Sequence, residues 1–128
     1  MLSITSFYAG LLALLFLALS FRVIASRRAN RISLGDAQNK DLRQRMRAHG
    51  NFAEYAPLGL VLLACAEMQS TPSVLVHLLG LLLLVGRSLH AAAFWVHPMI
   101  LKFRIAGMLT TFTMIGLSGA LLLINSLF

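Results

Sequence analysis

The chain alternates long apolar runs with short polar stretches. The apolar runs cover residues 2–25, 52–69, 73–96 and 105–128. Crossing a bilayer takes about 20 residues of helix. An amphipathic stretch precedes the second run, and the fourth helix is expected to start near 102–104. Helices are therefore expected over about 2–25, 42–69, 73–96 and 102–127. The pattern predicts an all-α fold in which a single domain, 1–128, forms an integral membrane four-helix bundle.

Local signals mark where these helices begin, bend and end. Gly35 and Asp36 favour a break after the first helix, and Asp41 is the expected N-cap of the second. Pro57 lies inside the second run, where it predicts a kink or a weakened hydrogen bond to Ala53.

All eleven Lys and Arg residues fall on one side of this pattern. Their positions are 22, 27, 28, 31, 40, 43, 45, 47, 87, 102 and 104. Short loops rich in Lys and Arg stay in the cytoplasm. Both termini are therefore expected outside the cytoplasm, with both basic loops inside it.

The basic charge also bears on the choice of partners. The formal net charge is +7, and at a membrane surface it favours anionic lipid headgroups by about 1 kcal/mol per residue. Nucleic acid is not an expected partner, because no aromatic-rich soluble surface accompanies the charge. No metal site is expected, because His90 and His97 share a helical face without the further ligands that zinc needs.

Two clusters of polar residues interrupt the apolar spans. On the second helix, Arg47, Asn51, Glu54 and Tyr55 have the spacing of one helical face. On the third, a similar face carries an arginine, a histidine and a phenylalanine: Arg87, His90 and Phe94. Ionisable groups inside a membrane are costly and usually functional. The two faces are expected to look at each other and to form a pocket for a small ligand with several charges.

A plainer alternative remains open at this point. Glu54 and Arg87 are expected at similar depth, so they could form a buried ion pair that only fixes the register of two helices. Such a pair would not need the surrounding polar residues, whereas a ligand pocket would.

Three stretches form a recognisable set: RRANR at 27–31, RAHGNFAEYAP at 47–57 and GRSLH at 86–90. They resemble the MAPEG family, the membrane-associated proteins in eicosanoid and glutathione metabolism. Their order and spacing match along nearly the whole chain, and the chain looks most like small bacterial inner-membrane members. The resemblance implies a homotrimer of four-helix subunits, with glutathione bound as co-substrate between neighbouring subunits near the cytoplasmic side.

The resemblance also implies roles for individual residues. Glu54 would receive the ammonium of glutathione, arginines would receive its carboxylates, and Arg104 would stabilise the thiolate. Loop arginines Arg28 and Arg31 would assist catalysis near the opening. The other implied binding residues are Arg47, His49, Asn51, Tyr55, Arg87, His90 and Phe94.

Phe94 departs from the family pattern, because functional members usually have tyrosine there. The leading hypothesis is a membrane glutathione transferase or peroxidase that acts on lipophilic electrophiles or lipid hydroperoxides. The competing hypothesis is a non-catalytic binding or structural membrane protein that keeps the polar pocket.

Overall fold

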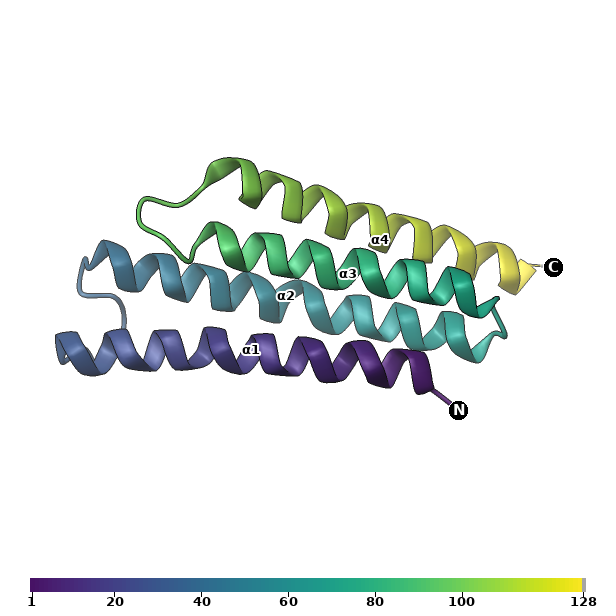
Figure 1. Cartoon of the computed structure of the whole chain (residues 1–128), viewed down its shortest axis with the longest axis horizontal. Coiled ribbons are helices and arrows are strands. Elements are labelled where there is room, and N and C mark those ends of the chain that lie inside the picture. Colours follow the sequence, from purple (N-terminus) through teal and green to yellow (C-terminus); the bar gives the residue numbers. More distant parts are fainter. Residues whose placement is uncertain (128) are drawn as a thin grey trace.

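The computed structural model describes residues 1–127 and contains four long helices that run up and down a bundle (Figure 1). They are α1 (Ser3–Asn30), α2 (Lys40–Met68), α3 (Ser73–Ala93) and α4 (Leu101–Leu127). The all-α fold predicted from the sequence is confirmed. The N-terminus and the end of α4 lie at one end of the bundle, and the α1–α2 and α3–α4 loops lie at the other (Figure 1).

The surface of the bundle is that of a membrane protein. Three helices are long and apolar enough to span a bilayer, namely α1, α3 and α4. Large apolar side chains such as Phe7, Leu14, Leu109 and Ile124 are exposed on the outside. The helix α2 is 29 residues long, but it carries the polar cluster described below. It is therefore not among the helices that are apolar enough to span a bilayer.

The helices begin and end slightly differently from the sequence prediction. The helix α1 continues past residue 25 to Asn30, because Arg27 and Arg28 suit the negative end of a helix dipole. Asn39, not Asp41, is the N-cap of α2, with its side chain accepting from the Leu42 N–H at 2.9 Å. The prediction for Asp41 was wrong because the helix already begins at Lys40.

The helix α3 ends at Ala93, before the predicted residue 96. The carbonyl groups of its last turn accept from the backbone N–H groups of Phe94, Trp95 and Ile100. Arg22 of α1 then donates to the carbonyl oxygens of Phe94 and Trp95, both at 3.1 Å, and its guanidinium lies 4.2 Å from the centre of the Trp95 ring. The chain after α3 is thus tied to α1.

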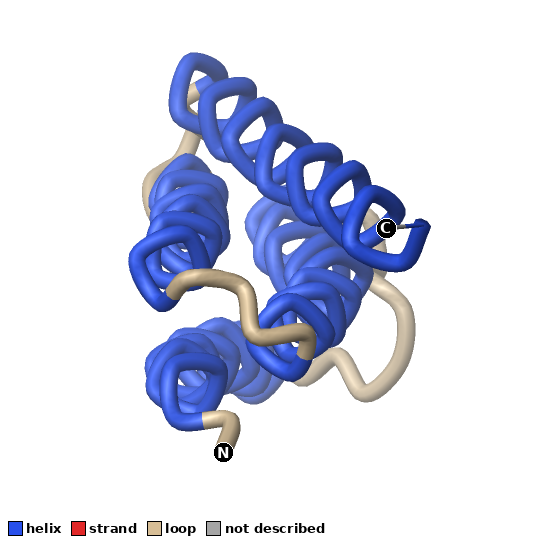
Figure 2. The backbone as a smooth tube through the Cα atoms, turned by 90° about the vertical axis from the view of Figure 1, so that its right-hand side faces the viewer, coloured by secondary structure: helices blue, strands red, loops and turns tan. Residues whose placement is uncertain are grey.

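Seen from the end, α2 and α3 lie between α1 and α4 (Figure 2). The outer helices each pack on both central ones. This arrangement brings α2, α3 and α4 together around one interior, and the polar residues expected on α2 and α3 can therefore meet there.

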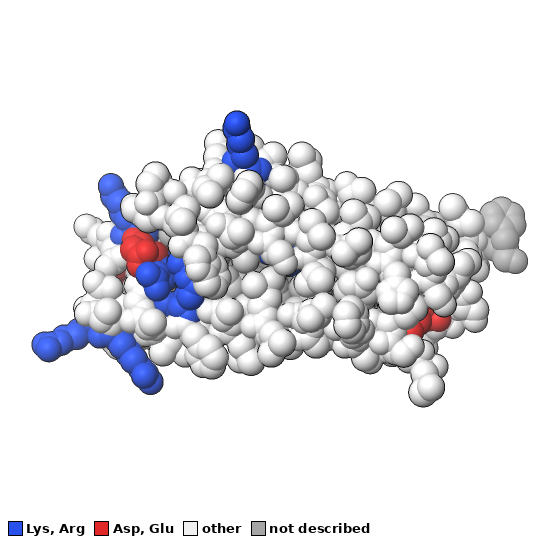
Figure 3. All heavy atoms as spheres, in the orientation of Figure 1, with Lys and Arg blue, Asp and Glu red and all other residues white. Residues whose placement is uncertain are grey.

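The two ends of the bundle differ in charge. Lys and Arg side chains gather at the end that carries the two long loops (Figure 3). At the opposite end, the Glu67 carboxylate accepts from the backbone N–H groups of Ile4 and Thr5 at 3.0 and 2.8 Å. Glu67 therefore caps the start of α1.

Candidate functional site

The polar interior of the bundle is built around Arg87 of α3. This side chain is only 1% exposed, and it is the one arginine or lysine among the buried residues of the described chain. Its Nη1 donates to Oδ1 of Asn51 on α2 at 2.6 Å. Its Nε and Nη2 donate to the Thr111 hydroxyl on α4 at 3.1 and 2.8 Å. One guanidinium thus joins three helices.

No carboxylate neutralises this buried cation. The ion pairs within residues 1–127 are Arg43–Asp36, Arg45–Asp41 and Arg47–Glu54, and none of them includes Arg87. The alternative of a buried Glu54–Arg87 ion pair is therefore wrong. A buried charge held by neutral partners alone is costly, and this favours an anion as a further partner.

A close contact between α3 and α4 places Thr111 against Arg87. The two helices meet at Gly86 and Gly107. A Cβ on Gly107 would lie 2.6 Å from the His90 nitrogen and 2.7 Å from the Gly86 oxygen. A Cβ on Gly86 would lie 2.6 Å from the Thr111 hydroxyl oxygen. Because glycine has no side chain, the backbones approach closely enough for a threonine hydroxyl to reach the guanidinium.

Asn51 and Tyr55 line the same interior from α2, as the sequence predicted. Asn51 is buried, and Tyr55 is half-buried. The guanidinium carbon of Arg87 lies 5.5 Å from the centre of the Tyr55 ring, a distance suited to a cation–π contact. Tyr55 in turn meets Phe112 of α4 edge-on.

Arg47 and Glu54 share the α2 face but open outward. Arg47 Nη1 lies 3.7 Å from Glu54 Oε1, and their side chains are 59% and 54% exposed. This open pair presents a cation and an anion together. Such a surface suits a ligand that itself carries an ammonium and a carboxylate.

His90, Phe94 and Arg104 form a second group towards the loop end of the bundle. His90 and Phe94 are buried, and their ring centres are 5.1 Å apart. The guanidinium carbon of Arg104 lies 5.9 Å from the centre of the Phe94 ring. Arg104 of α4 thus lies beside the C-terminal end of α3, next to His90 and Phe94.

Three predicted site residues lie elsewhere in the single chain. His49 faces α1, where its Nε2 lies 3.1 Å from the Ser20 hydroxyl and its ring stacks on Phe16. Arg28 and Arg31 lie at the end of α1, in a hollow of their own. The structure therefore does not gather these three residues around Arg87 within one subunit.

Sequence reasoning missed two contributors. From the sequence, Thr111 would be only a small residue for helix packing. In the structure, the crossing of α3 and α4 brings its hydroxyl to Arg87. From the sequence, Arg22 would be only a cation at the membrane interface, whereas in the structure it donates a hydrogen bond to the Phe94 carbonyl. The glycines that precede Thr111 and Arg87 were the available signal for the first contact.

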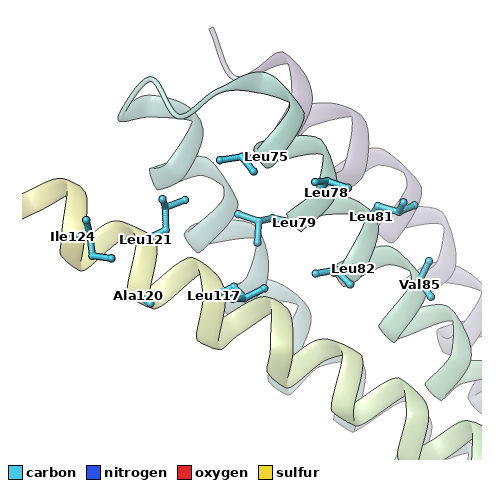
Figure 4. A pocket seen from close by; sticks show the side chains of 10 residues that line it. All are labelled: Leu75, Leu78, Leu79, Leu81, Leu82, Val85, Leu117, Ala120, Leu121 and Ile124. Atoms are coloured by element: carbon cyan, nitrogen blue, oxygen red, sulfur yellow. The ribbon is translucent and has the colours of Figure 1, made fainter.

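A large groove between the halves of α3 and α4 that lie away from the basic loops is chemically separate from this site (Figure 4). Its volume is about 640 Å³, and its lining is aliphatic throughout. It extends from Leu75 to Val85 on α3 and from Leu117 to Ile124 on α4. It offers no group that could activate a reactant.

A helical membrane bundle with a buried arginine, an open ion pair and a basic end defines a class of membrane protein with an intramembrane polar site. Comparison with known proteins identifies the family: the MAPEG family model matches residues 5–123. The chain belongs to the MAPEG family.

Two relatives support this assignment. The chain is 36% identical over 108 residues to the inner membrane protein YecN of Escherichia coli K12, and equally to YecN of Escherichia coli O6:H1. Each match covers 84% of this chain and 81% of the relative. The predicted family is thus confirmed, and with three apolar helices the comparison indicates an inner membrane protein.

Proposed function

We propose that this protein is a glutathione-dependent transferase or peroxidase of the inner membrane that acts on lipophilic electrophiles or lipid hydroperoxides. The observation that carries the proposal is the buried Arg87, held only by neutral side chains, with the Arg47–Glu54 pair on the same α2 face as its partner Asn51. Membership of a family that takes its name partly from glutathione metabolism supports the same ligand.

Glutathione has an ammonium group and two carboxylates, and the α2 face offers matching charges. Glu54 would receive the ammonium and Arg47 a carboxylate, each through charge-assisted hydrogen bonds. Asn51, Tyr55, Arg87 and His90 would shape the inner wall. Arg104 would lie near the sulfur, where a guanidinium lowers the pKa of a thiol and so increases the thiolate present at neutral pH.

The reaction would follow from the thiolate. In conjugation, the sulfur forms a bond to an electrophilic carbon. Either this carbon loses its leaving group with the bonding electron pair, or an adjacent atom receives the displaced electron pair and takes up a proton. In peroxide reduction, two glutathione molecules are oxidised to the disulfide while a hydroperoxide becomes an alcohol and water. The substrate would enter from the bilayer, whereas glutathione would come from the cytoplasm.

A homotrimer would complete this site. Arg47 and Glu54 are more than half exposed in the single chain, and a charged pair that faces lipid is unfavourable. Contact with a neighbouring subunit would cover the pair and bring further side chains of that subunit towards it. The basic loop end would face the cytoplasm.

The test is turnover by the purified protein with glutathione and a panel of lipophilic electrophiles and hydroperoxides. Arg104→Ala should abolish conjugation and leave glutathione binding mostly intact, because Arg47 and Glu54 still hold the ends of the peptide. Lys102→Ala is the matched control, since Lys102 lies in the same turn of α4 and is exposed. Equal loss of turnover in both variants would contradict the role of Arg104.

The second candidate is a glutathione-binding protein without turnover, and Phe94 favours it. Its ring occupies the place between His90 and Arg104, where functional relatives usually offer a hydroxyl. Phe94→Tyr should tighten glutathione binding by about 0.5–1.5 kcal/mol if the hydroxyl meets the ligand. Binding by the unaltered protein without any turnover across the panel would favour this candidate.

A further inference from the structure

The inner end of α1 carries a concave basic surface, the α1 hollow. Its volume is about 350 Å³. The lining residues are Ile24, Arg27, Arg28, Arg31, Ile32 and Ser33. Unlike the polar interior around Arg87, the α1 hollow opens at the loop end of the bundle.

The backbone shapes the hollow at the point where α1 ends. Arg31 has a φ of 55°, in the left-handed region, and the chain turns back on itself there. The N–H groups of Arg31 and Ile32 donate to the carbonyl oxygens of Arg28 and Arg27 at 3.3 and 3.0 Å. These bonds satisfy carbonyl groups at the negative end of the helix dipole, which would otherwise oppose an anion.

Arg27 forms part of the wall. Its guanidinium donates to the Gly35 carbonyl at 2.9 Å and approaches the Met46 sulfur at 3.5 Å. It thereby ties the α1–α2 loop to the bundle. Arg28 and Arg31 are exposed and remain available to a ligand.

The acidic groups near this end already have partners. Asp36 lies 2.5 Å from Arg43, and the hydrogen bond from Arg43 holds the pKa of the Asp36 carboxyl below its usual range, so it stays ionised and paired. Asp41 pairs with Arg45 at 2.9 Å, and Glu54 with Arg47. Within residues 1–127, Arg28 and Arg31 therefore have no carboxylate in salt-bridge range.

An apolar wall leads away from these two cations along α1. Ile24 lies one turn before Arg28 and is 43% exposed, and Phe21 is 62% exposed. A complementary ligand has an anionic head and a long apolar body. We propose that the α1 hollow binds an anionic phospholipid, with its phosphate between Arg28 and Arg31 and one acyl chain along Ile24 and Phe21.

This inference does not rest on the proposed glutathione chemistry. It gives Arg28 and Arg31 a lipid ligand, whereas the family resemblance implies that they assist catalysis. The two roles predict different losses when the arginines are removed.

The experiment compares phosphatidylglycerol with phosphatidylcholine of the same acyl chains, added to the full-length protein in mild detergent. Native mass spectrometry measures the lipid that each variant retains. Arg28→Ala with Arg31→Ala should lower phosphatidylglycerol retention at least about 10-fold, because each arginine would donate a charge-assisted hydrogen bond to the phosphate. Retention of phosphatidylcholine should not change.

The matched control is Lys40→Ala with Lys102→Ala. Both lysines are exposed and lie outside the hollow, so the control removes the same charge and should retain phosphatidylglycerol nearly as the unaltered protein does. Arg28→Lys with Arg31→Lys should keep part of the retention, because lysine preserves the charge without the planar fork. If the double alanine variant does not fold, Arg28→Gln and Arg31→Gln are each compared with Lys40→Gln.

Equal loss in the arginine and lysine pairs would overturn the site and leave only diffuse attraction to anionic lipid. Unchanged lipid retention in the arginine variant would also overturn it. If glutathione affinity then fell instead, the arginines would belong to the thiol site. Loss of lipid with unchanged glutathione affinity supports the inference.

Discussion

Glu54 and Glu67 lie on the same helix, α2, in surroundings that give them different roles. Glu54 is 54% exposed, and its ion-pair partner is Arg47. Glu67 accepts from the backbone of Ile4 and Thr5 and so holds the start of α1. The first is free to meet a ligand, whereas the second stabilises the fold. This difference allows a matched test of the site.

Glu54→Gln should weaken glutathione binding by roughly 10- to 100-fold, since a charge-assisted hydrogen bond contributes about 1.5–3 kcal/mol. The thermal unfolding temperature should hardly change, because the buried cation Arg87 is held by Asn51 and Thr111 and not by Glu54. Titration calorimetry and thermal unfolding on the same preparation measure both effects. Unchanged affinity would remove Glu54 from the site.

Glu67→Gln is the control and should behave in the opposite way. The neutral amide would be a weaker acceptor for the first turn of α1 than the carboxylate, and we expect a loss of about 1 kcal/mol in the free energy of unfolding. Glutathione affinity should stay the same, because Glu67 lies at the far end of the bundle from the basic loops. A large loss of affinity in this variant would mean that both substitutions act through the fold.

The sequence predicted part of the residue-scale chemistry. Helical spacing placed Asn51 on the face that meets Arg87, and the hydrogen bond between them confirms it. The same spacing also allowed a Glu54–Arg87 pair. Helical periodicity places Asn51 and Glu54 on one face but does not show which of them points into the bundle. Thr111 could not be assigned to Arg87 from spacing, since the contact depends on how α3 and α4 cross.

At the scale of elements, the crossing of α3 and α4 at Gly86 and Gly107 determines the site. The nearest atoms to a Cβ on Gly107 are backbone atoms of His90 and Gly86. Backbone cannot move aside as a flexible side chain can. Any side chain at this position would therefore push the two helices apart and draw Thr111 away from Arg87.

Gly107→Ala should lower the free energy of unfolding by about 1–3 kcal/mol, as overpacking of a tight contact does, and should weaken glutathione binding as well. Gly116→Ala on the same helix is the control, because a Cβ there meets nothing within 4 Å. It should be neutral or slightly stabilising through helix propensity. Thermal unfolding measures the stability of both variants. Equal stability of Gly107→Ala and Gly116→Ala would contradict a close crossing of α3 and α4 at Gly107.

Helix ends were the least predictable elements. The apolar run suggested that α3 reaches residue 96, but the structure ends it at Ala93, and Arg22 of α1 donates to the carbonyl groups of the next two residues. Such a contact joins residues that are far apart in the chain, and local hydropathy cannot detect it. The four helices themselves followed from the apolar runs, although the polar cluster keeps α2 out of the three helices that are apolar enough to span a bilayer.

At the scale of the whole molecule, the distribution of charge predicts the orientation. The basic side chains gather at the loop end of the bundle (Figure 3), as their positions in the sequence indicated. Reporter fusions after Gln38 and after His97 should read cytoplasmic, and a fusion following residue 128 should read periplasmic. A cytoplasmic C-terminus would contradict the four-span topology and place the polar site on the wrong side for a reduced thiol.

Assembly is the second prediction at this scale. The open Arg47–Glu54 pair needs cover within a membrane, and a trimer with sites at its subunit boundaries would provide it. Mass measurement in mild detergent should give three copies. A stable monomer that still binds glutathione would rule out sites shared between subunits.

The central claim is that the protein binds glutathione and ionises its thiol, and ultraviolet absorbance of the thiolate tests this most directly. The pKa of a free thiol is about 8.5, and a nearby guanidinium lowers it by stabilising the thiolate. Glutathione bound to the unaltered protein should therefore show thiolate absorbance at least about one pH unit lower, and Arg104→Ala should return the titration to that of free glutathione. Failure of glutathione to bind, or a bound thiol that titrates as it does in free solution, would contradict the account.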